Sequence, residues 1–245
     1  MVARQQDSVL TPHYNATTRA VVSSLGALLG ISSISHGVLE IIQGNAPTPG
    51  SFVKALGPGH SWTLWVHGSE PAFTLFHNFL VTGVLATAMG FLLIIWSVRY
   101  IESRGGATVF LLISVASFLA GGGLAQVLLF TFNWAAATRI RATLGFWQGI
   151  MPSFLRRALA RVWTPALIAA GILFMAALEI ATFGYFPGLP HDTQALTRIL
   201  WGLAAAIIAT VLLAIVAGFA HDLETRAAGS GFHRHDSEGA AVRHD

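Results

Sequence analysis

Long apolar runs with almost no charge are the feature that most constrains this chain. Five runs are each long enough to cross the roughly 30 Å hydrocarbon core of a bilayer as a helix. They lie at about residues 21–43, 73–97, 107–131, 164–186 and 199–220. Backbone groups in lipid must be satisfied within their own segment, and the alternating strands of a membrane barrel are absent from the sequence. The predicted fold class is therefore all-α, a polytopic transmembrane helical bundle of about five spans.

The composition agrees with lipid as the surrounding solvent. Of the 245 residues, 54% are hydrophobic and 10% are charged, and the mean hydropathy is +0.64. A soluble domain usually carries about 25% charged residues. The net charge of +3 is too small and too dispersed to indicate nucleic-acid binding, so the lipid bilayer is the expected partner. Cysteine is absent, which excludes disulfides and thiolate metal sites.

Polar segments flank and interrupt the predicted bundle of residues 21–226. Residues 1–20 form a polar N-terminal segment. The apolar run after it is long and contains His36 and Glu40, whereas a cleaved signal peptide has a short, purely apolar core. At about 142–162, aromatic residues alternate with arginines, which predicts an amphipathic segment in the headgroup layer. Residues 227–245 are small and polar, so a disordered tail is expected there.

The distribution of Lys and Arg predicts an orientation. With five spans and the N-terminus outside, the inner segments hold nine of these residues and the outer segments hold five. Because cytoplasmic segments carry the excess of Lys and Arg, this count favours N-out and C-in. The preference for Arg over Lys, with abundant Ala and Gly, suggests a bacterial plasma (inner) membrane.

Small residues recur at every fourth position in several spans. Examples are Gly26 and Gly30 in the first span, Ser117 and Gly121 in the third, and a line through Gly202 in the fifth. Such stripes let helix backbones approach closely. We expect them to pack helices within the bundle; the alternative is contact with a second copy or a partner membrane subunit.

Five polar residues within the spans form the candidate intramembrane polar site. They are His36, Glu40, His77, Asn78 and Glu179. An ionisable side chain near the middle of a bilayer costs at least about 2.5–3.5 kcal/mol, so such residues are rare and tend to be functional.

The first four of these residues are expected to converge. His36 and Glu40 are four residues apart on the first span and hence on one helix face, which Ser32 extends. His77 and Asn78 begin the second span, at a depth similar to the end of the first in a helical hairpin. Glu179 lies well inside the fourth span, at a different depth. A separate polar line, Gln126 and Asn133, marks the third span.

The chemistry of this group remains open at the level of sequence. Two imidazoles and a carboxylate suit a metal ion, paired imidazoles suit haem, and a carboxylate beside a histidine suits proton transfer. The structural alternative is that His36 and Glu40 satisfy each other near a helix end. A protonated Glu179 would likewise bond to a neighbouring helix. No motif assigns a catalytic residue, a cofactor or a metal.

Two function classes fit the sequence. One is a non-enzymatic bundle that binds or passes a small solute or a proton through the polar site. The other is a membrane-anchor subunit of an electron-transfer or assembly complex, with haem held by His36 and His77. An enzyme is disfavoured because hydrolase, nucleotide-binding and prenyl-diphosphate motifs are all missing.

Several short segments carry a resemblance to known sequences. They are Ser35–Asn45, Asn78–Gly83, Gly121–Gly123 and Thr138–Ile140. These segments resemble a family of small, uncharacterised bacterial multi-pass membrane proteins, over most of residues 30–222. The resemblance implies a multi-span membrane protein and brings no activity, ligand or site residue with it.

Overall fold

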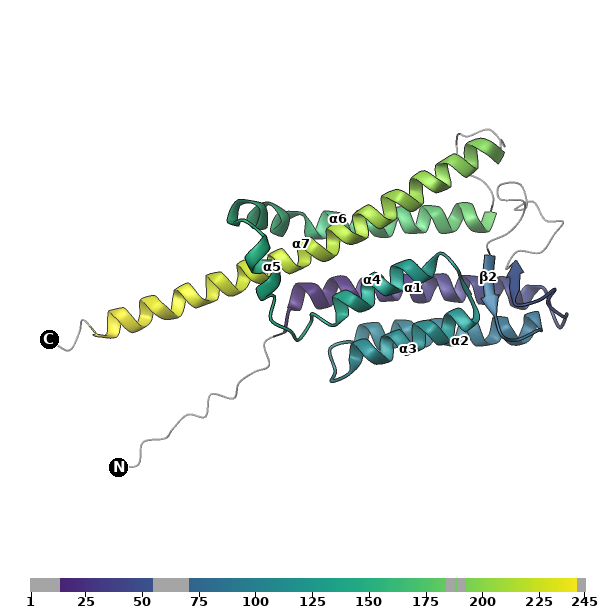
Figure 1. Ribbon diagram of the computed structural model, residues 1–245, viewed down its shortest axis with the longest axis horizontal. Coiled ribbons are helices and arrows are strands. Elements are labelled where there is room, and N and C mark those ends of the chain that lie inside the picture. Colours follow the sequence, from purple (N-terminus) through teal and green to yellow (C-terminus); the bar gives the residue numbers. More distant parts are fainter. Residues whose placement is uncertain (1–13, 55–70, 184–187, 189–192, 242–245) are drawn as a thin grey trace, which may run out of the picture.

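The described residues form an all-α helical bundle, as the sequence predicts. The computed structural model describes residues 14–54, 71–183, 188 and 193–241 (Figure 1). Four of its helices are long and apolar enough to cross a membrane. These are α1 (Ala16–Ile42), α2 (Phe79–Arg99), α6 (Ser153–Phe183) and α7 (Thr193–Ala241).

The predicted third span is interrupted. Instead of one helix over 107–131, the chain forms α3 (Gly106–Leu119), a short extended segment β3 (Ala120–Gly123) and α4 (Gln126–Ala137). Glycine is a poor helix former, and Gly121 adopts a φ of +108°, which no helix allows. The run of three glycines therefore ends α3 and lets α4 fold back beside it as a helical hairpin.

A small antiparallel sheet covers one end of the bundle. Its order is β1 (Phe52–Lys54), β2 (Pro71–Thr74) and β3, with Phe52 opposite Phe73 and Ala72 opposite Gly123. We call this end, where α1 finishes, the sheet end (Figure 1).

Glycines bring α1 and α2 into close contact. A Cβ atom on Gly30 would lie 2.6 Å from the Gly90 carbonyl oxygen, and one on Gly37 would lie 2.6 Å from the Gly83 carbonyl oxygen. No side chain fits between these backbones. The small-residue stripe of the first span therefore packs within the chain.

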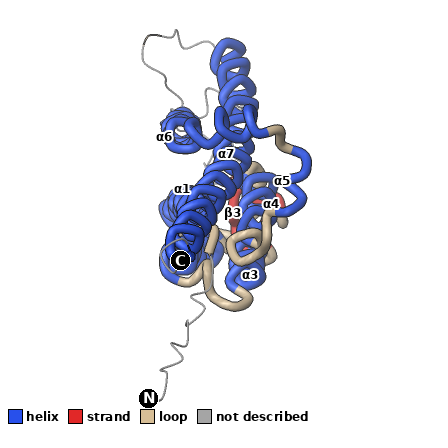
Figure 2. Tube along the Cα trace, turned by 90° about the vertical axis from the view of Figure 1, so that its left-hand side faces the viewer, coloured by secondary structure: helices blue, strands red, loops and turns tan. Residues whose placement is uncertain are grey.

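Helices α6 and α7 form a second layer. They lie side by side, apart from the layer that contains α1, α2, α3 and α4 (Figures 1 and 2). The predicted amphipathic segment at 142–162 is the short helix α5 (Gly145–Ile150) followed by the first turns of α6. An Arg156–Glu224 ion pair joins these turns to α7.

The backbone of α7 is helical as far as Ala241. This differs from the disordered tail predicted for 227–245, of which residues 242–245 lie outside the described part of the chain. Extending an existing helix gains one hydrogen bond for each residue fixed, without the cost of nucleation. A long apolar span therefore provides a nucleus from which polar residues can continue the helix.

The two layers are joined where α1 begins. The Asp222 carboxylate of α7 accepts hydrogen bonds from the backbone N–H groups of Thr17 (2.9 Å) and Thr18 (2.8 Å). Arg226 donates to the side-chain oxygen of Asn15 at 2.6 Å. We call Asn15, Thr17, Thr18, Asp222 and Arg226 the latch, and this end of the bundle the latch end.

The latch places the start of α1 and the end of the last span at the same end of the bundle. The N-out, C-in arrangement places the start of α1 and the end of the last span on opposite sides, whereas the latch holds both at one end. The α3–α4 hairpin is the reason, because it adds one reversal of chain direction that a single third span would lack.

Candidate functional site

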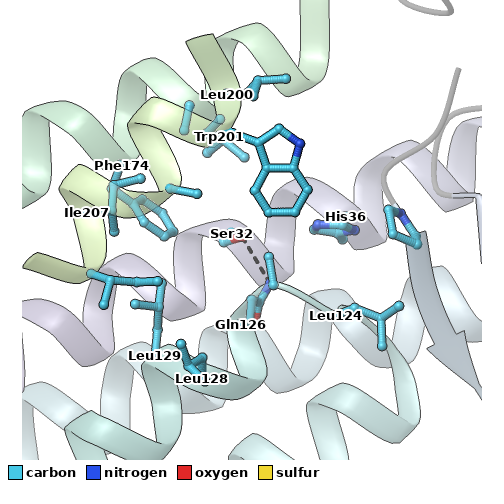
Figure 3. Close-up of a pocket in the computed structure, with 16 residues that line it drawn as sticks. Ser32, His36, Leu124, Gln126, Leu128, Leu129, Phe174, Leu200, Trp201 and Ile207 are labelled. Atoms are coloured by element: carbon cyan, nitrogen blue, oxygen red, sulfur yellow. Dashed lines mark hydrogen bonds between the residues drawn. The ribbon is translucent and has the colours of Figure 1, made fainter. Parts of the chain in front are cut away.

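A cavity of about 490 Å³ lies between the two layers of helices. Its volume is within the range of small-molecule sites, roughly 300–1,000 Å³. Most of its wall is aliphatic or aromatic (Figure 3). The lining residues come from α1, β2, the loop between β3 and α4, and helices α4, α6 and α7. They include Pro71, Leu124, Leu128, Leu129, Phe174, Ala177, Leu178, Leu200, Ala204, Ile207 and Ile208.

Three polar side chains gather at one part of this wall: Ser32 and His36 from α1 and Gln126 from the start of α4. The Gln126 amide donates a hydrogen bond of 2.9 Å to the Ser32 hydroxyl. Trp201 of α7 lies across the cavity from them, with its indole directed toward Gln126 and His36 (Figure 3). The cavity therefore has an extended apolar part and a compact polar part.

Helical spacing places these α1 residues in a row. Ser32, His36 and Glu40 follow one another at intervals of four and share one face of the helix. His36 is 3% exposed and lines the cavity, whereas Glu40 is fully buried and does not. Glu40 therefore lies behind His36, toward the sheet end.

The glycines of β3 make room for this row. A Cβ atom on Gly121 would lie 2.6 Å from a carboxylate oxygen of Glu40, and one on Gly123 would lie 2.5 Å from Nε2 of His36. Both distances are shorter than van der Waals contact allows. The interruption of the third span thus brings bare backbone against the two ionisable side chains.

Polar groups from α2 and the sheet surround Glu40. The Thr82 hydroxyl lies beside it, 2.6 Å from the Ala120 carbonyl oxygen and 2.7 Å from the Thr74 hydroxyl. Within the described part of the chain, neither oxygen of Glu40 has a hydrogen-bond partner of regular geometry. His36 lies within electrostatic range of the carboxylate. A charged carboxylate buried here needs a nearby cation, and the His36 imidazole can supply it.

The structure brings together two of the five residues predicted to form the site. His36 and Glu40 are adjacent, but His77 is exposed in the turn before α2 and does not line the cavity. The two imidazoles considered for haem therefore do not share this site. Among the residues described, no three His, Cys, Asp or Glu side chains are grouped closely enough to hold a metal ion.

Asn78 and Glu179 have other positions. Asn78 is the N-cap of α2: its side-chain oxygen accepts from the N–H groups of Leu80 (3.0 Å) and Val81 (3.2 Å). The second span begins at Phe79, six residues later than predicted, so Asn78 precedes the helix and serves to start it. Glu179 is exposed on α6 and is not part of the cavity wall.

Gln126 and Trp201 are members of the site that the sequence did not assign to it. Gln126 was visible as part of a polar line on the third span, but a continuous helix gave no reason to place it against Ser32. Trp201 has no distinguishing sequence signal, because aromatic residues are common near the ends of membrane helices.

No family model matches this chain, and comparisons with curated proteins and with solved structures likewise give no match. Fold alone does not imply function, so the chemistry of the cavity is the basis for a functional assignment.

Proposed function

We propose that this membrane protein binds a small, largely apolar molecule in the cavity between its two helical layers. The observation that carries the proposal is an apolar cavity of about 490 Å³ with one polar part formed by Ser32, His36 and Gln126. Binding sites for small molecules combine these two properties: an apolar wall provides affinity, and a few polar groups fix orientation.

The arrangement of the helices supports a binding role. The latch joins the layers at one end, while the cavity separates α6 and α7 from α1 and α4 closer to the sheet end. A bound molecule would supply the packing contacts that this part of the bundle otherwise lacks.

A pair of substitutions on α7 tests the proposal. Ala204 lines the cavity, whereas its neighbour Ala205 is exposed and does not. Ala204→Phe should fill the space, and Ala205→Phe adds the same side chain outside it. We expect native mass spectrometry of protein purified from its own membranes to show a small bound molecule in the wild type and in A205F, and none in A204F. The same bound masses in all three proteins, or none in any, would refute the proposal.

We also infer that the latch end faces the cytoplasm, with both ends of the bundle inside. Within the described part of residues 14–226, nine arginines lie toward the latch end: Arg19, Arg99, Arg104, Arg139, Arg141, Arg156, Arg157, Arg161 and Arg226. Lys54 and Arg198 lie toward the sheet end. This asymmetry is stronger than the one that favoured N-out, and cytoplasmic segments carry the excess of Lys and Arg.

The absence of cysteine from the chain allows a direct test of this orientation. Thr143 is exposed near the latch end and Gln194 is exposed at the start of α7, toward the sheet end. In intact cells, a membrane-impermeant maleimide should label Gln194→Cys and leave Thr143→Cys unlabelled until the membrane is opened. Labelling of Thr143→Cys in intact cells would reverse the assignment.

A further inference from the structure

The charge of the cavity wall restricts what the cavity can hold. Among the residues that the structure describes, no Lys, Arg, Asp or Glu lines it. A ligand with a phosphate, sulfonate or carboxylate group would find no guanidinium or ammonium partner there. A ligand with an ammonium group would find no exposed carboxylate, because Glu40 is fully buried behind His36.

Among the described residues of the wall, His36 is the ionisable one, and the carboxyl group of Glu40 can balance its charge. His36 lies within electrostatic range of the Glu40 carboxyl group, which is buried behind it. One proton divided between an imidazole and a carboxylate leaves the pair neutral, whichever group holds it. His36 therefore offers hydrogen bonding to the cavity without offering net charge.

The polar part of the wall is suited to an oxygen atom. The Gln126 amide and the Ser32 hydroxyl are joined to each other at 2.9 Å, which leaves the second amide proton, the amide oxygen and the hydroxyl proton of this pair for other partners. Together with the His36 imidazole they provide both donors and acceptors within one small region (Figure 3). A hydroxyl or carbonyl oxygen can use such a mixed set, since neither requires a charged partner.

We propose that the ligand is an uncharged, lipid-soluble molecule with a hydroxyl or carbonyl oxygen, held with this oxygen at Ser32, His36 and Gln126. The inference rests on the proposed function, and it adds the chemical class of the ligand. The apolar body of the molecule lies along Phe174, Leu129 and Ile207. Trp201, which is 74% exposed, borders the cavity on an apolar helix long enough to cross a membrane, and this position suits a ligand that enters from the lipid.

Three photoreactive probes of one chain length test the class of ligand. Each is an alkyl diazirine that ends in a hydroxyl, a sulfonate or a trimethylammonium group. The sulfonate and the trimethylammonium group keep their charge inside a membrane, because neither gains or loses a proton near neutral pH. The full-length protein in lipid nanodiscs is irradiated with each probe, and labelling of cavity residues is measured by peptide mass spectrometry. We expect the hydroxyl probe to label them about a hundredfold more than either charged probe, because an uncompensated charge is disfavoured to that extent inside a membrane.

The alanine pair separates the two proposals. Labelling that is lost in A204F and kept in A205F reports occupation of the cavity. If a charged probe labels the cavity as well as the hydroxyl probe does, and A204F removes that labelling, the ligand class is wrong and the binding function stands. If every probe labels A204F as strongly as it labels the wild type, the proposed binding of a molecule in the cavity is wrong as well.

Two further substitutions test the contact between the ligand oxygen and the polar side chains of the cavity. Gln126→Leu keeps the size of the side chain and removes its hydrogen bonds, so labelling by the hydroxyl probe should fall about fivefold. Ser32→Ala is the smaller change and serves if Gln126→Leu does not fold. If Gln126→Leu and Ser32→Ala both fold and are labelled as strongly as the wild type, the proposed contact between the ligand oxygen and these side chains is wrong.

Discussion

Single residues decide whether the site can form, and Gly121 is the clearest case. It combines a positive φ of +108° with a carboxylate oxygen of Glu40 that lies 2.6 Å from where a Cβ atom would be. Any other residue would be strained by the backbone conformation and would also need the space that Glu40 occupies. The requirement for glycine here is therefore both conformational and steric.

Gly121→Ala should destabilise the protein by about 2 kcal/mol or more, since strain and overpacking each cost about 1–3 kcal/mol. Gly145→Ala is the control: a Cβ atom at Gly145, the first residue of α5, would meet nothing within 4 Å. Thermal melting followed by tryptophan fluorescence distinguishes them. Equal melting temperatures for G121A and the wild type would contradict the contact between β3 and α1.

Glu40 is expected to act on the ligand through His36, as a positioning residue. A carboxylate strengthens hydrogen bonding by the imidazole because charge-assisted hydrogen bonds exceed neutral ones by about 1 kcal/mol. Glu40→Gln should therefore reduce retention of the bound molecule about fivefold while the protein still folds. Glu179→Gln changes the same group on the exposed face of α6 and should have no effect. Equal retention in E40Q and E179Q would argue that Glu40 is only structural.

At the scale of elements, the latch explains how α1 and α7 are held together. The first N–H groups of a helix have no partner inside it, and the start of α1 has no side-chain cap of its own. Asp222 fills this role from another helix, with additional bonding from the Thr18 hydroxyl at 2.6 Å. A carboxylate at a helix N-terminus is also favoured by the helix dipole.

Asp222→Ala should cost about 2–4 kcal/mol, because hydrogen bonds to a buried charged group contribute about 1.5–3 kcal/mol each and are not fully additive. Thr225→Ala, one turn further along α7, removes an exposed hydroxyl that bonds only within its own helix and should be neutral. Equal melting temperatures for D222A and T225A would show that the latch contributes little to the stability of the fold.

The contact between α1 and α2 depends on glycine in the same way. A Cβ atom on Gly90 would lie 2.7 Å from the Gly30 carbonyl oxygen and 2.9 Å from the Ile34 nitrogen, both of which are backbone atoms that cannot rotate away. Gly90→Val should separate the helices and cost about 3 kcal/mol or more. Gly202→Val enters open space on α7 and should leave a single sharp peak in size-exclusion chromatography. Normal behaviour of G90V would contradict the close approach.

At the scale of the whole molecule, the sequence predicted the class of fold because hydropathy is a local property. Long uncharged runs identify membrane helices whatever their neighbours are. The pairing of His36 with Glu40 was predictable for a similar reason, since a spacing of four residues on one helix settles which face they share.

The third span shows where local patterns are ambiguous. Gly121, Gly122 and Gly123 fit a close-packing stripe on a helix as well as a break between two helices. The choice between them changes the direction of every later helix, and with it the number of Lys and Arg residues on each side of the membrane. The arginine count favours a different topology once the hairpin is included.

The cavity could not be predicted from sequence. It depends on how the α6–α7 layer lies against α1 and α4, which has no signature in any one segment. Gln126 and Trp201 meet across the cavity although 75 positions separate them in the chain. The position of a cavity is decided by contacts between elements, whereas the periodicity of a sequence describes only one element at a time.

The central claim is that a small molecule occupies the space beside His36. An experimental density map of the full-length protein in nanodiscs made from its own membrane lipids tests it most directly, with A204F as a second sample. We expect elongated density from Ser32, His36 and Gln126 to Ile207 in the wild type, and its loss in A204F. A wild-type map in which α6 and α7 close against α1 and leave no space would show that the protein does not bind a molecule there, as would identical density in both proteins.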